Sequence, residues 1–364
     1  MRIAVLGVGL IGGSIGLAAQ RRLEAQVVGY DPAPETVERA LGLGVLTRGE
    51  RSVAAAVAGA DIVFCAAPVG ALPALVSAAL ETSGEDTVVS DVGSTKRELA
   101  DRLRSSPAAG RFIGGHPIAG AETAGVENAR AELFEGARWY LTPDERAGGL
   151  HYDRLQRVVA DLGARPQAID AELHDRLMAT VSHLPHVIAN VMVAQAETAL
   201  SEDSERLPEV GRSFRDTTRI AGANPAIWTD IFKSNSEAVA AEIDRAVERL
   251  RQAAELIRAG DAEAVDAWQR RALDARRRLL DAGTGGGSLL ELRVAVDNKP
   301  GVVAEIALAL GRAGVNIEDM ALSPAADMRT GAISLWVAGD ADVDRAIGVL
   351  RELGHAASAV GSGE

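Results

Sequence analysis

The 364-residue sequence is poor in cysteine and in lysine. Its single cysteine, Cys65, excludes an internal disulfide and any metal site built from several thiolates. It lies within the apolar run DIVFCAAP, where we expect a buried strand residue. Only three of the 38 basic residues are lysines and the others are arginines, so each lysine can be considered individually.

The chain also lacks an excess of positive charge. It has 38 lysines and arginines against 51 aspartates and glutamates, which gives a formal net charge of −13. Nucleic acids and anionic membranes bind proteins through basic faces, so we expect neither as a partner. An anionic substrate would have to be held by a local group of arginines, and the segment RSFRDTTRIAG carries one.

Long apolar runs are missing near the N-terminus. The segment MRIAVLGVGLIGGS holds one early arginine and is interrupted by glycines, so it fits neither a signal peptide nor a membrane-spanning helix. With 47% hydrophobic and 24% charged residues, the composition is typical of a soluble globular protein. These features predict a cytoplasmic protein.

The order of apolar patterns predicts an α/β protein with three domains. Residues 1–169 alternate short β-like runs with helical stretches, which predicts a largely parallel sheet with helices on both faces. Residues 170–281 show long helical periods without strand candidates, and residues 282–288 form a glycine-rich linker. Residues 289–364 follow the order strand, helix, strand, strand, helix, strand, which is the ferredoxin-like βαββαβ arrangement.

A dinucleotide-binding motif follows the first predicted strand. Gly7, Gly9 and Gly12 stand in G-x-G-x-x-G register and open a helix, as in a Rossmann-like domain. The second strand ends in Asp31, where an acid would bind the ribose hydroxyls of NAD and repel the 2′-phosphate of NADP. The alternatives are a glycine turn without a ligand and, for Asp31, a turn residue before proline.

Three further strand ends, in AAPVG, SDVGSTK and GGHPIAG, are expected to line one cleft. In an open α/β sheet the ligand lies at the carboxyl ends of the strands. This places His116, from the last of the three segments, beside the nicotinamide of a bound NAD.

Five motifs carry a resemblance to a known family. GLIGGS, SDVGSTK, GGHPIAG, SHLPH and RDTTRIAGANPAIW occur in the order and at the approximate spacing seen in the prephenate dehydrogenase family of tyrosine biosynthesis. The C-terminal segment, with DNKPGVVAEI and GVNIEDM, resembles an ACT regulatory domain. The resemblance covers essentially the whole chain and implies NAD-dependent oxidative decarboxylation of prephenate to 4-hydroxyphenylpyruvate.

The resemblance implies that His116 and Ser94 are catalytic. His116 would accept the proton of the ring hydroxyl as the hydride leaves to NAD, a task that suits a neutral imidazole. The small residues around it would let the substrate ring and the nicotinamide approach each other. Ser94 would hydrogen-bond the same hydroxyl. The alternatives are a loop histidine bonded to backbone and, for Ser94, a helix N-cap followed by a solvated Lys96.

Arg219 matches the family arginine that binds the ring carboxylate. A guanidinium can hold a carboxylate through two parallel hydrogen bonds, so Arg219 is expected to position the substrate. Its neighbours Arg212 and Arg215 have a plainer interpretation as surface charges paired with Asp216.

The motif SHLPH contributes two histidines, three residues apart on a predicted helix. No glutamate completes H-E-x-x-H and no third ligand is evident, so we expect no metal. By resemblance His186 contacts the substrate side chain and His183 supports it. Trp228 matches a tryptophan at the mouth of the pocket that can come from a partner subunit, and its alternative is a helical core aromatic.

The helical segment and the C-terminal domain predict two kinds of partner. The long apolar faces of the helices are expected to pack against a second subunit in a homodimer. By resemblance, an ACT domain would bind an amino acid near Asn298, Gly301 and Asn316, with tyrosine as the natural effector. The alternative is that Gly301 is a turn residue, that Asn316 is a strand-entry residue, and that the domain binds nothing.

Three other functions stay open at this point. An arogenate dehydrogenase differs only in an amino group that replaces the keto oxygen of the substrate side chain. A β-hydroxy-acid dehydrogenase would carry a catalytic lysine on the first long helix of its second domain, where this chain has His183 and His186. A non-catalytic sensor of NAD and an amino acid would combine the same two ligand domains.

Overall fold

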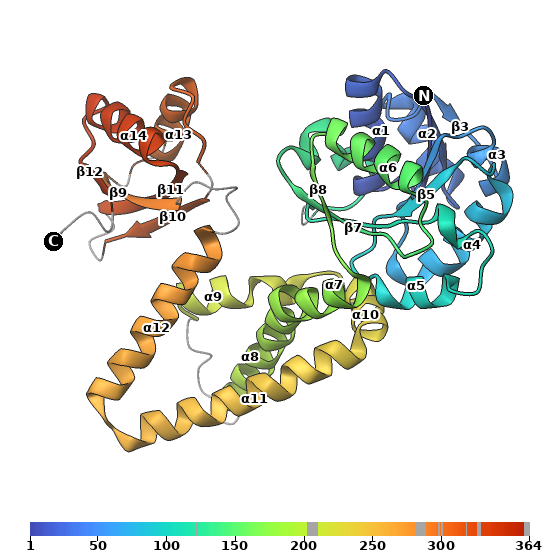
Figure 1. Ribbon diagram of the computed structural model, residues 1–364. Helices are drawn as coiled ribbons and strands as arrows, with labels where there is room; N and C mark the ends of the chain where they lie inside the picture. The colour runs from blue at the N-terminus through green and yellow to red at the C-terminus, as the bar shows by residue number, and fades with distance from the viewer. Residues whose placement is uncertain are drawn as a thin grey trace. The chain divides into compact units, whose positions relative to one another are not determined.

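The computed structural model (Figure 1) describes residues 1–120, 123–201, 210–281, 289–297, 299, 301–317, 319–325 and 329–359. The chain forms two compact units, residues 1–249 and 250–364. Each unit is described by itself.

The first unit is built on a five-stranded parallel sheet of order β3-β2-β1-β4-β5. Its strands are β1 (Arg2–Leu6), β2 (Gln26–Tyr30), β3 (Arg48–Gly49), β4 (Ile62–Cys65) and β5 (Val88–Asp91). The helices that connect them are α1 (Leu10–Leu23), α2 (Pro34–Gly42), α3 (Val53–Val57), α4 (Leu72–Thr82) and α5 (Arg97–Leu103).

Both faces of this sheet are buried, which explains why its strands are almost entirely apolar. Along β1, Ile3 and Val5 join one hydrophobic core while Ala4 and Leu6 join another on the opposite face. The chain leaves β1 toward β2 and later returns to pair β4 on the other side of β1. The crevice at the carboxyl ends of β1 and β4 is therefore the place where such sheets bind ligands. The predicted Rossmann-like arrangement is confirmed.

A second sheet of three strands was not predicted. It contains β6 (Gly114–Pro117), β7 (Arg138–Thr142) and β8 (Arg165–Ala168), and β6 is antiparallel to β7. The sequence predicts that these strands extend one largely parallel sheet. A parallel pair needs a crossover, usually a helix, and α6 (Gly149–Asp161) supplies one between β7 and β8. The described part of the β6–β7 connection has only the 3₁₀ turns Val126–Asn128 and Ala131–Phe134, so the chain returns antiparallel.

Helices follow the second sheet, as predicted. Asp170 begins α7 by accepting a hydrogen bond from the backbone N–H of Leu173 at 2.9 Å. The elements are α7 (Ala171–Met178), the π-helical turn η5 (Ala179–His183), α8 (Leu184–Ser201), α9 (Arg212–Thr218), α10 (Pro225–Ser234) and α11 (Ser236–Ala259).

The stretch Ala171–Thr198 has the length and composition of a membrane-crossing helix, and it is the one such stretch in the described parts of the chain. Length and composition are weak evidence by themselves, because core helices of soluble proteins share them. Here the stretch carries the buried polar residues His174, Asp175, His183 and His186, which contact other elements of the first unit. These contacts indicate a helix of the folded unit.

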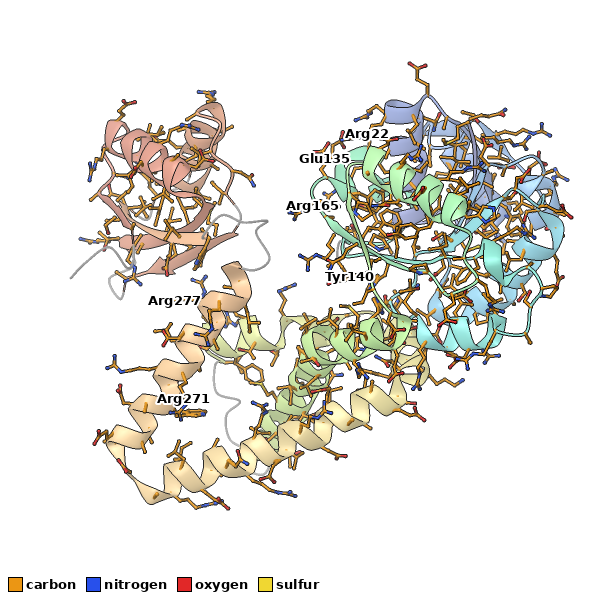
Figure 2. All side chains as sticks on the ribbon, viewed as in Figure 1. Arg22, Glu135, Tyr140, Arg165, Arg271 and Arg277 are labelled. Carbon is orange, nitrogen blue, oxygen red and sulfur yellow. The ribbon has the colours of Figure 1, made fainter. Side chains whose placement is uncertain are left out.

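The second unit ends in a four-stranded antiparallel sheet of order β10-β11-β9-β12. Its elements are α12 (Ala262–Asp281), β9 (Leu289–Asp297), α13 (Val302–Arg312), β10 (Asp319–Pro324), β11 (Thr330–Ala338), α14 (Asp340–Glu352) and β12 (Ala357–Ala359). The predicted βαββαβ order is confirmed. Arg271 and Arg277 of α12 are exposed (Figure 2). The three predicted boundaries, after residues 169, 281 and 288, stay predictions, and linker residues 282–288 lie outside the described residues.

Candidate active site

The loop after β1 has the geometry of a nucleotide-binding turn. Gly7 has a φ of +95°, and a Cβ there would lie 2.4 Å from the carbonyl oxygen of Ala66. A Cβ at Gly12 would lie 2.0 Å from the carbonyl oxygen of Gly7, so α1 and the loop after β1 pack too closely for any side chain. At Gly9 a Cβ would meet nothing within 4 Å, which leaves open space where a pyrophosphate can approach the backbone.

Asp31 lies at the rim of this loop. Its carboxylate accepts hydrogen bonds from the backbone N–H groups of Val8, at 2.9 Å, and Ala33, at 3.0 Å. A cleft of about 390 Å³ is lined by Asp31, Gly9 and residues of α2 and the β6–β7 connection. The cleft lies beside the Asp31 carboxylate and the open space at Gly9, which fits the adenosine half of a dinucleotide. The carboxylate therefore fixes the loop and still faces the cleft.

His116 lies on β6, opposite Tyr140 of β7, and is half-buried. The two glycines before it serve packing, which corrects the sequence-based interpretation that they make room for ligands. A Cβ at Gly114 would lie 2.3 Å from the hydroxyl oxygen of Thr142, and one at Gly115 would lie 2.6 Å from the carbonyl oxygen of Asp91. The β6 strand therefore sits directly against the end of β5.

A buried ion pair joins these two strand ends. The Lys96 ammonium contacts the Asp91 carboxylate, and both side chains are at most 1% exposed. Lys96 Nζ also donates to the carbonyl oxygen of Gly115 at 2.7 Å, while Asp91 accepts from the N–H groups of Gly115, at 3.1 Å, and Gly93, at 2.8 Å. Lys96 was expected in solvent if Ser94 were only a helix cap, and that expectation is wrong.

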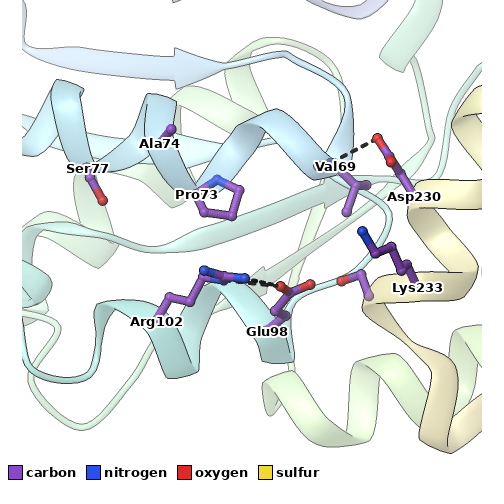
Figure 3. Close-up of a pocket in the computed structure, with 10 residues that line it drawn as sticks. Val69, Pro73, Ala74, Ser77, Glu98, Arg102, Asp230 and Lys233 are labelled. Carbon is purple, nitrogen blue, oxygen red and sulfur yellow. Dashed lines mark hydrogen bonds and ion pairs between the residues drawn. The ribbon is translucent and has the colours of Figure 1, made fainter.

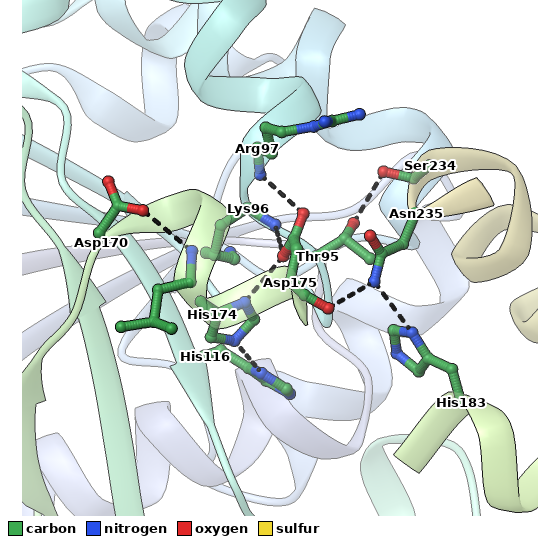
Figure 4. A network of polar contacts seen from close by, with 12 residues as sticks. Thr95, Lys96, Arg97, His116, Asp170, His174, Asp175, His183, Ser234 and Asn235 are labelled. Atoms are coloured by element: carbon green, nitrogen blue, oxygen red, sulfur yellow. Dashed lines mark hydrogen bonds and ion pairs between the residues drawn. The ribbon is translucent and has the colours of Figure 1, made fainter. Parts of the chain in front are cut away.

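Three side chains form a continuous polar contact that starts at His116 (Figure 4). His116 Nδ1 lies 2.9 Å from His174 Nε2, and His174 Nδ1 lies 2.8 Å from Asp175 Oδ1. The carboxylate of Asp175 also accepts hydrogen bonds from the backbone N–H groups of Lys96, at 2.8 Å, and Arg97, at 2.9 Å. His174 and Asp175 are both buried. Sequence reasoning missed this pair, although an adjacent His and Asp on an amphipathic helix were a visible signal.

Burial sets the protonation state of the histidines in this region. The pKa of His116 is lowered well below its ordinary value, first by desolvation and then by the neighbouring His174, Lys96 and His183. Burial also lowers the pKa of His183 to about 4. Both rings are therefore neutral near pH 7, and His116 can accept a proton there.

Ser94 lies in the segment between β5 and α5 and is half-buried. Its alternative role as a helix cap is wrong, because α5 begins at Arg97 and the carboxylate of Asp175 receives the first backbone N–H groups. Among the described residues the Ser94 hydroxyl has no hydrogen-bond partner. It is therefore available to a ligand.

The turn that carries His183 is a π-helical turn. The backbone N–H of Leu184 donates to the carbonyl oxygen of Ala179, five residues earlier, where an α-helix would use the residue four earlier. Pro185 follows directly and explains the wide turn. A proline has no N–H to donate to the carbonyl of Val181, and its ring clashes with that carbonyl in a regular helix.

Asn235 connects His183 to the buried contact of Asp175. Its side-chain amide lies 3.2 Å from His183 Nδ1 and donates to the backbone carbonyl of Asp175 at 2.8 Å. Because the amide nitrogen is a donor, His183 Nδ1 accepts and the ring hydrogen lies on Nε2. His183 can therefore donate one hydrogen bond from its other side.

His186 is covered by Trp228. The two rings stack with centroids 3.7 Å apart and planes inclined by 13°, and Phe232 lies next to both. His186 Nδ1 is buried and has no partner among the described residues. Burial lowers the pKa of this ring. Trp228 thus contacts a histidine of its own chain.

Arg219 lies on other elements than these histidines. It is exposed where α9 ends and the 3₁₀ turn η6 (Arg219–Gly222) begins, and η6 packs against α8, the helix of His186. The predicted surface pairing is confirmed for Arg212, whose Nε lies 3.4 Å from Asp216 Oδ2. In the parts of the chain that the structure describes, no group of three or more His, Cys, Asp or Glu residues is placed to hold a metal.

Comparison with known proteins assigns the chain to a family. Residues 15–167 match the nucleotide-binding domain of prephenate dehydrogenase, and residues 170–270 match its dimerization domain. The chain is 30% identical to the prephenate dehydrogenase of Bacillus subtilis (strain 168) over 353 residues. This alignment covers 94% of each of the two chains. This chain belongs to the prephenate dehydrogenase family.

Solved structures agree with this assignment. The prephenate dehydrogenase of A. aeolicus in complex with hydroxyphenyl propionate and NAD⁺ has a TM-score of 0.69 and 32% identity, covering 77% of this chain and 98% of that one. The Synechocystis arogenate dehydrogenase, at 24% identity, has a TM-score of 0.67 with 77% and 100% coverage, and shares the fold. NAD is the cofactor. The match to the nucleotide-binding domain of the prephenate dehydrogenase family indicates it, and the geometry of Gly7 and Asp31 fits it.

This prephenate dehydrogenase family member carries an additional C-terminal domain. Residues 292–355 match an ACT domain like that of the AHAS small subunit. Gly301 has a φ of +93° and begins α13, and Asn316 is exposed in the segment before β10. Asn298 lies outside the described residues. The predicted effector site therefore stays a prediction.

A separate polar cleft lies on the other face of α10 (Figure 3). It encloses about 690 Å³ between α4, α5 and α10, and its lining includes Glu98, Arg102, Asp230 and Lys233. Asp230 accepts a hydrogen bond from the backbone N–H of Gly70 at 3.1 Å. None of the predicted site residues lines this cleft. It is not the candidate active site of this prephenate dehydrogenase family member.

Proposed function

We propose that the chain catalyses the NAD-dependent oxidative decarboxylation of prephenate to 4-hydroxyphenylpyruvate and carbon dioxide. The observation that carries the proposal is a neutral, half-buried His116 in the same unit as a dinucleotide loop, on the strand next to the carboxyl end of β5. Membership of the prephenate dehydrogenase family supports the substrate.

The chemistry requires one base that later returns its proton. The hydride at ring C4 leaves to NAD⁺ while the C4 hydroxyl proton moves to His116, and C4 becomes a carbonyl. The C1–carboxylate bond then breaks, carbon dioxide leaves, and the electron pair makes the ring a phenolate. The phenolate takes the proton back from His116, so no net proton is released. A neutral imidazole suits both directions.

The remaining predicted residues would bind and orient prephenate. Ser94 has a free hydroxyl for the C4 oxygen, and Arg219 would hold the ring carboxylate. His186 would contact the substrate side chain, and His183 would support it. The buried Nδ1 of His186, which has no partner among the described residues, supports this role. Trp228 would exclude water from that end of the site.

The test is NADH formation by the purified protein with NAD, offered prephenate and arogenate in separate reactions. Turnover of prephenate is the expected result. Turnover of arogenate alone would make the chain an arogenate dehydrogenase. Bound NAD without turnover of either substrate would support the hydroxy-acid or sensor function instead.

The pH dependence of the reaction follows from the lowered pKa of His116. The neutral base is present above that pKa and is lost as the pH falls through it, so kcat/KM should begin to fall only below pH ~6.5, the ordinary imidazole value. The profile of kcat/KM for prephenate from acid to neutral pH measures this. A fall that begins above the ordinary value would contradict the buried, neutral His116.

Replacing Arg219 by Ala should raise KM for prephenate about 10- to 100-fold and change kcat much less. A charge-assisted hydrogen bond contributes about 1.5–3 kcal/mol, and the bound carboxylate leaves during the reaction, so the contact mainly positions the ground state. The matched control is Arg212→Ala, whose partner is Asp216, and its KM should not change. An unchanged KM in Arg219→Ala would assign the carboxylate to another cation.

The chain is further expected to act as a cytoplasmic homodimer that tyrosine regulates. A match to a dimerization domain over residues 170–270 supports the dimer, and the ACT-like match supports an amino-acid effector near Asn298, Gly301 and Asn316. Sedimentation at several protein concentrations tests the dimer. Prephenate turnover with and without tyrosine tests the effector, and equal rates in both would leave the domain without this role.

A further inference from the structure

The Asp175 carboxylate determines the protonation of the His174 ring. It accepts backbone N–H groups of Lys96 and Arg97 at 2.8 and 2.9 Å, and those amides can only donate. Its third contact, with His174 Nδ1 at 2.8 Å, therefore also requires a hydrogen on the ring nitrogen. In a neutral His174 this leaves Nε2 as an acceptor.

The acceptor on His174 in turn fixes the His116 tautomer. His174 Nε2 lies 2.9 Å from His116 Nδ1, so the hydrogen of a neutral His116 lies on Nδ1. The lone pair of His116 then lies on Nε2, on the far side of the ring. His174 is fully buried, and the Tyr140 ring packs edge-on against it with centroids 5.6 Å apart. The orientation of the His174 ring is therefore fixed by Asp175 on one side and by Tyr140 on another.

We propose that His174, oriented by Asp175, is a positioning residue that holds the base His116 in the Nδ1–H tautomer, so that Nε2 receives the substrate proton. The inference rests on the proposed function, because it assigns an atom and two supporting residues to its proton transfer. When Nε2 takes the proton, the new imidazolium donates from Nδ1 to a neutral acceptor backed by a carboxylate. A hydrogen bond from a charged donor is stronger than a neutral one.

Charges around His116 act in both directions. Those that face it or its partners come from β5, the segment before α5, β7, α7 and η5. Cationic Lys96, the ring of His183 and a protonated His174 oppose a positive charge on His116. A neutral His174 that accepts from His116 Nδ1, backed by the Asp175 carboxylate, favours it. Asp91 is neutralised by Lys96, and Tyr140 presents only its ring. His174 and Asp175 thus supply the one path that stabilises the transient cation among the described residues.

Two variants of His174 with side chains of equal length distinguish a positioning role of this residue from a role in filling space. His174→Gln keeps a carbonyl oxygen that can accept from His116 Nδ1–H, whereas His174→Met fills the same space without a strong acceptor. We expect kcat for prephenate to fall about 100-fold in the Met variant and much less in the Gln variant, with KM for prephenate and NAD binding unchanged in both. Equal kcat losses in the two variants would overturn the proposal.

A double-mutant cycle asks whether His174 acts through His116. In a His116→Asn background, His174→Met should cause no further loss of kcat, because the base that it positions is gone. Losses that multiply would show an independent role for His174 and would overturn the proposal. A structural role alone would not produce the coupling, and thermal unfolding of each variant checks that the fold persists.

Nitrogen-15 NMR of the imidazole rings tests the tautomers without any turnover. The chain has only six histidines, so their ring signals can be assigned by single substitutions. We expect the Nδ1–H form for both His116 and His174 near neutral pH. The Nε2–H form at His116 would overturn the inference even if prephenate is turned over. Conversely, the expected tautomers without turnover would confirm that His174 holds the His116 ring in the Nδ1–H form and would reject the proposed function, and with it the transfer of a substrate proton to Nε2.

Discussion

Replacing His116 by Asn should reduce kcat for prephenate between about 100- and 10,000-fold, the range that a general base contributes. The asparagine amide can still donate to His174 Nε2, where His116 Nδ1 now lies 2.9 Å away, so the buried contact with Asp175 should survive. Only the proton acceptor is lost. NAD affinity, measured through quenching of tryptophan fluorescence, should stay the same.

The measurement for His116→Asn is NADH formation in a single turnover, which separates chemistry from product release. His151→Asn is the matched control, because His151 lies on α6 and its Nδ1 is 3.4 Å from the carbonyl oxygen of Gly110. That variant should retain full activity. If His116→Asn retains it as well, another group takes the proton and the proposed mechanism is wrong.

Replacing Lys96 by Met should lower the free energy of unfolding by about 3–5 kcal/mol. The change leaves the Asp91 carboxylate buried without its cation and removes the hydrogen bond to Gly115 that ties the loop after β5 to β6. An unpaired charge in a buried site is costly because its lost hydration is not replaced. Denaturant unfolding of the wild type and the variant gives the difference.

Two comparisons make the Lys96 result specific. Lys233→Met changes an exposed lysine and should alter stability by well under 1 kcal/mol. The double variant Asp91→Asn with Lys96→Met removes both charges and should be more stable than Lys96→Met alone. If the single and double variants unfold alike, the loss comes from packing and not from an uncompensated charge.

The nucleotide loop was predictable because its signals are local. Gly7, Gly9 and Gly12 act within one turn and one helix, and Asp31 follows on the adjacent strand. The order of strands and helices likewise follows from apolar patterns along the chain. These parts of the fold needed no knowledge of distant contacts.

The candidate site was harder because its contacts join distant segments. The pairing of Lys96 with Asp91 depends on how β5 meets β6, and the contact of His116 with His174 joins residues 58 positions apart. Both depend on the second sheet, whose antiparallel β6 the alternating pattern did not reveal. The π-helical turn at His183 had a local signal in Pro185, which forbids a regular helical bond there.

The scarcity of lysine has a practical consequence once Lys96 is known to be buried. Among the described residues the other two lysines, Lys233 and Lys299, are exposed. Acylating reagents should modify these amines rapidly and Lys96 only when the β5–β6 region opens. The rate at which Lys96 is labelled would thus report local opening directly beside His116.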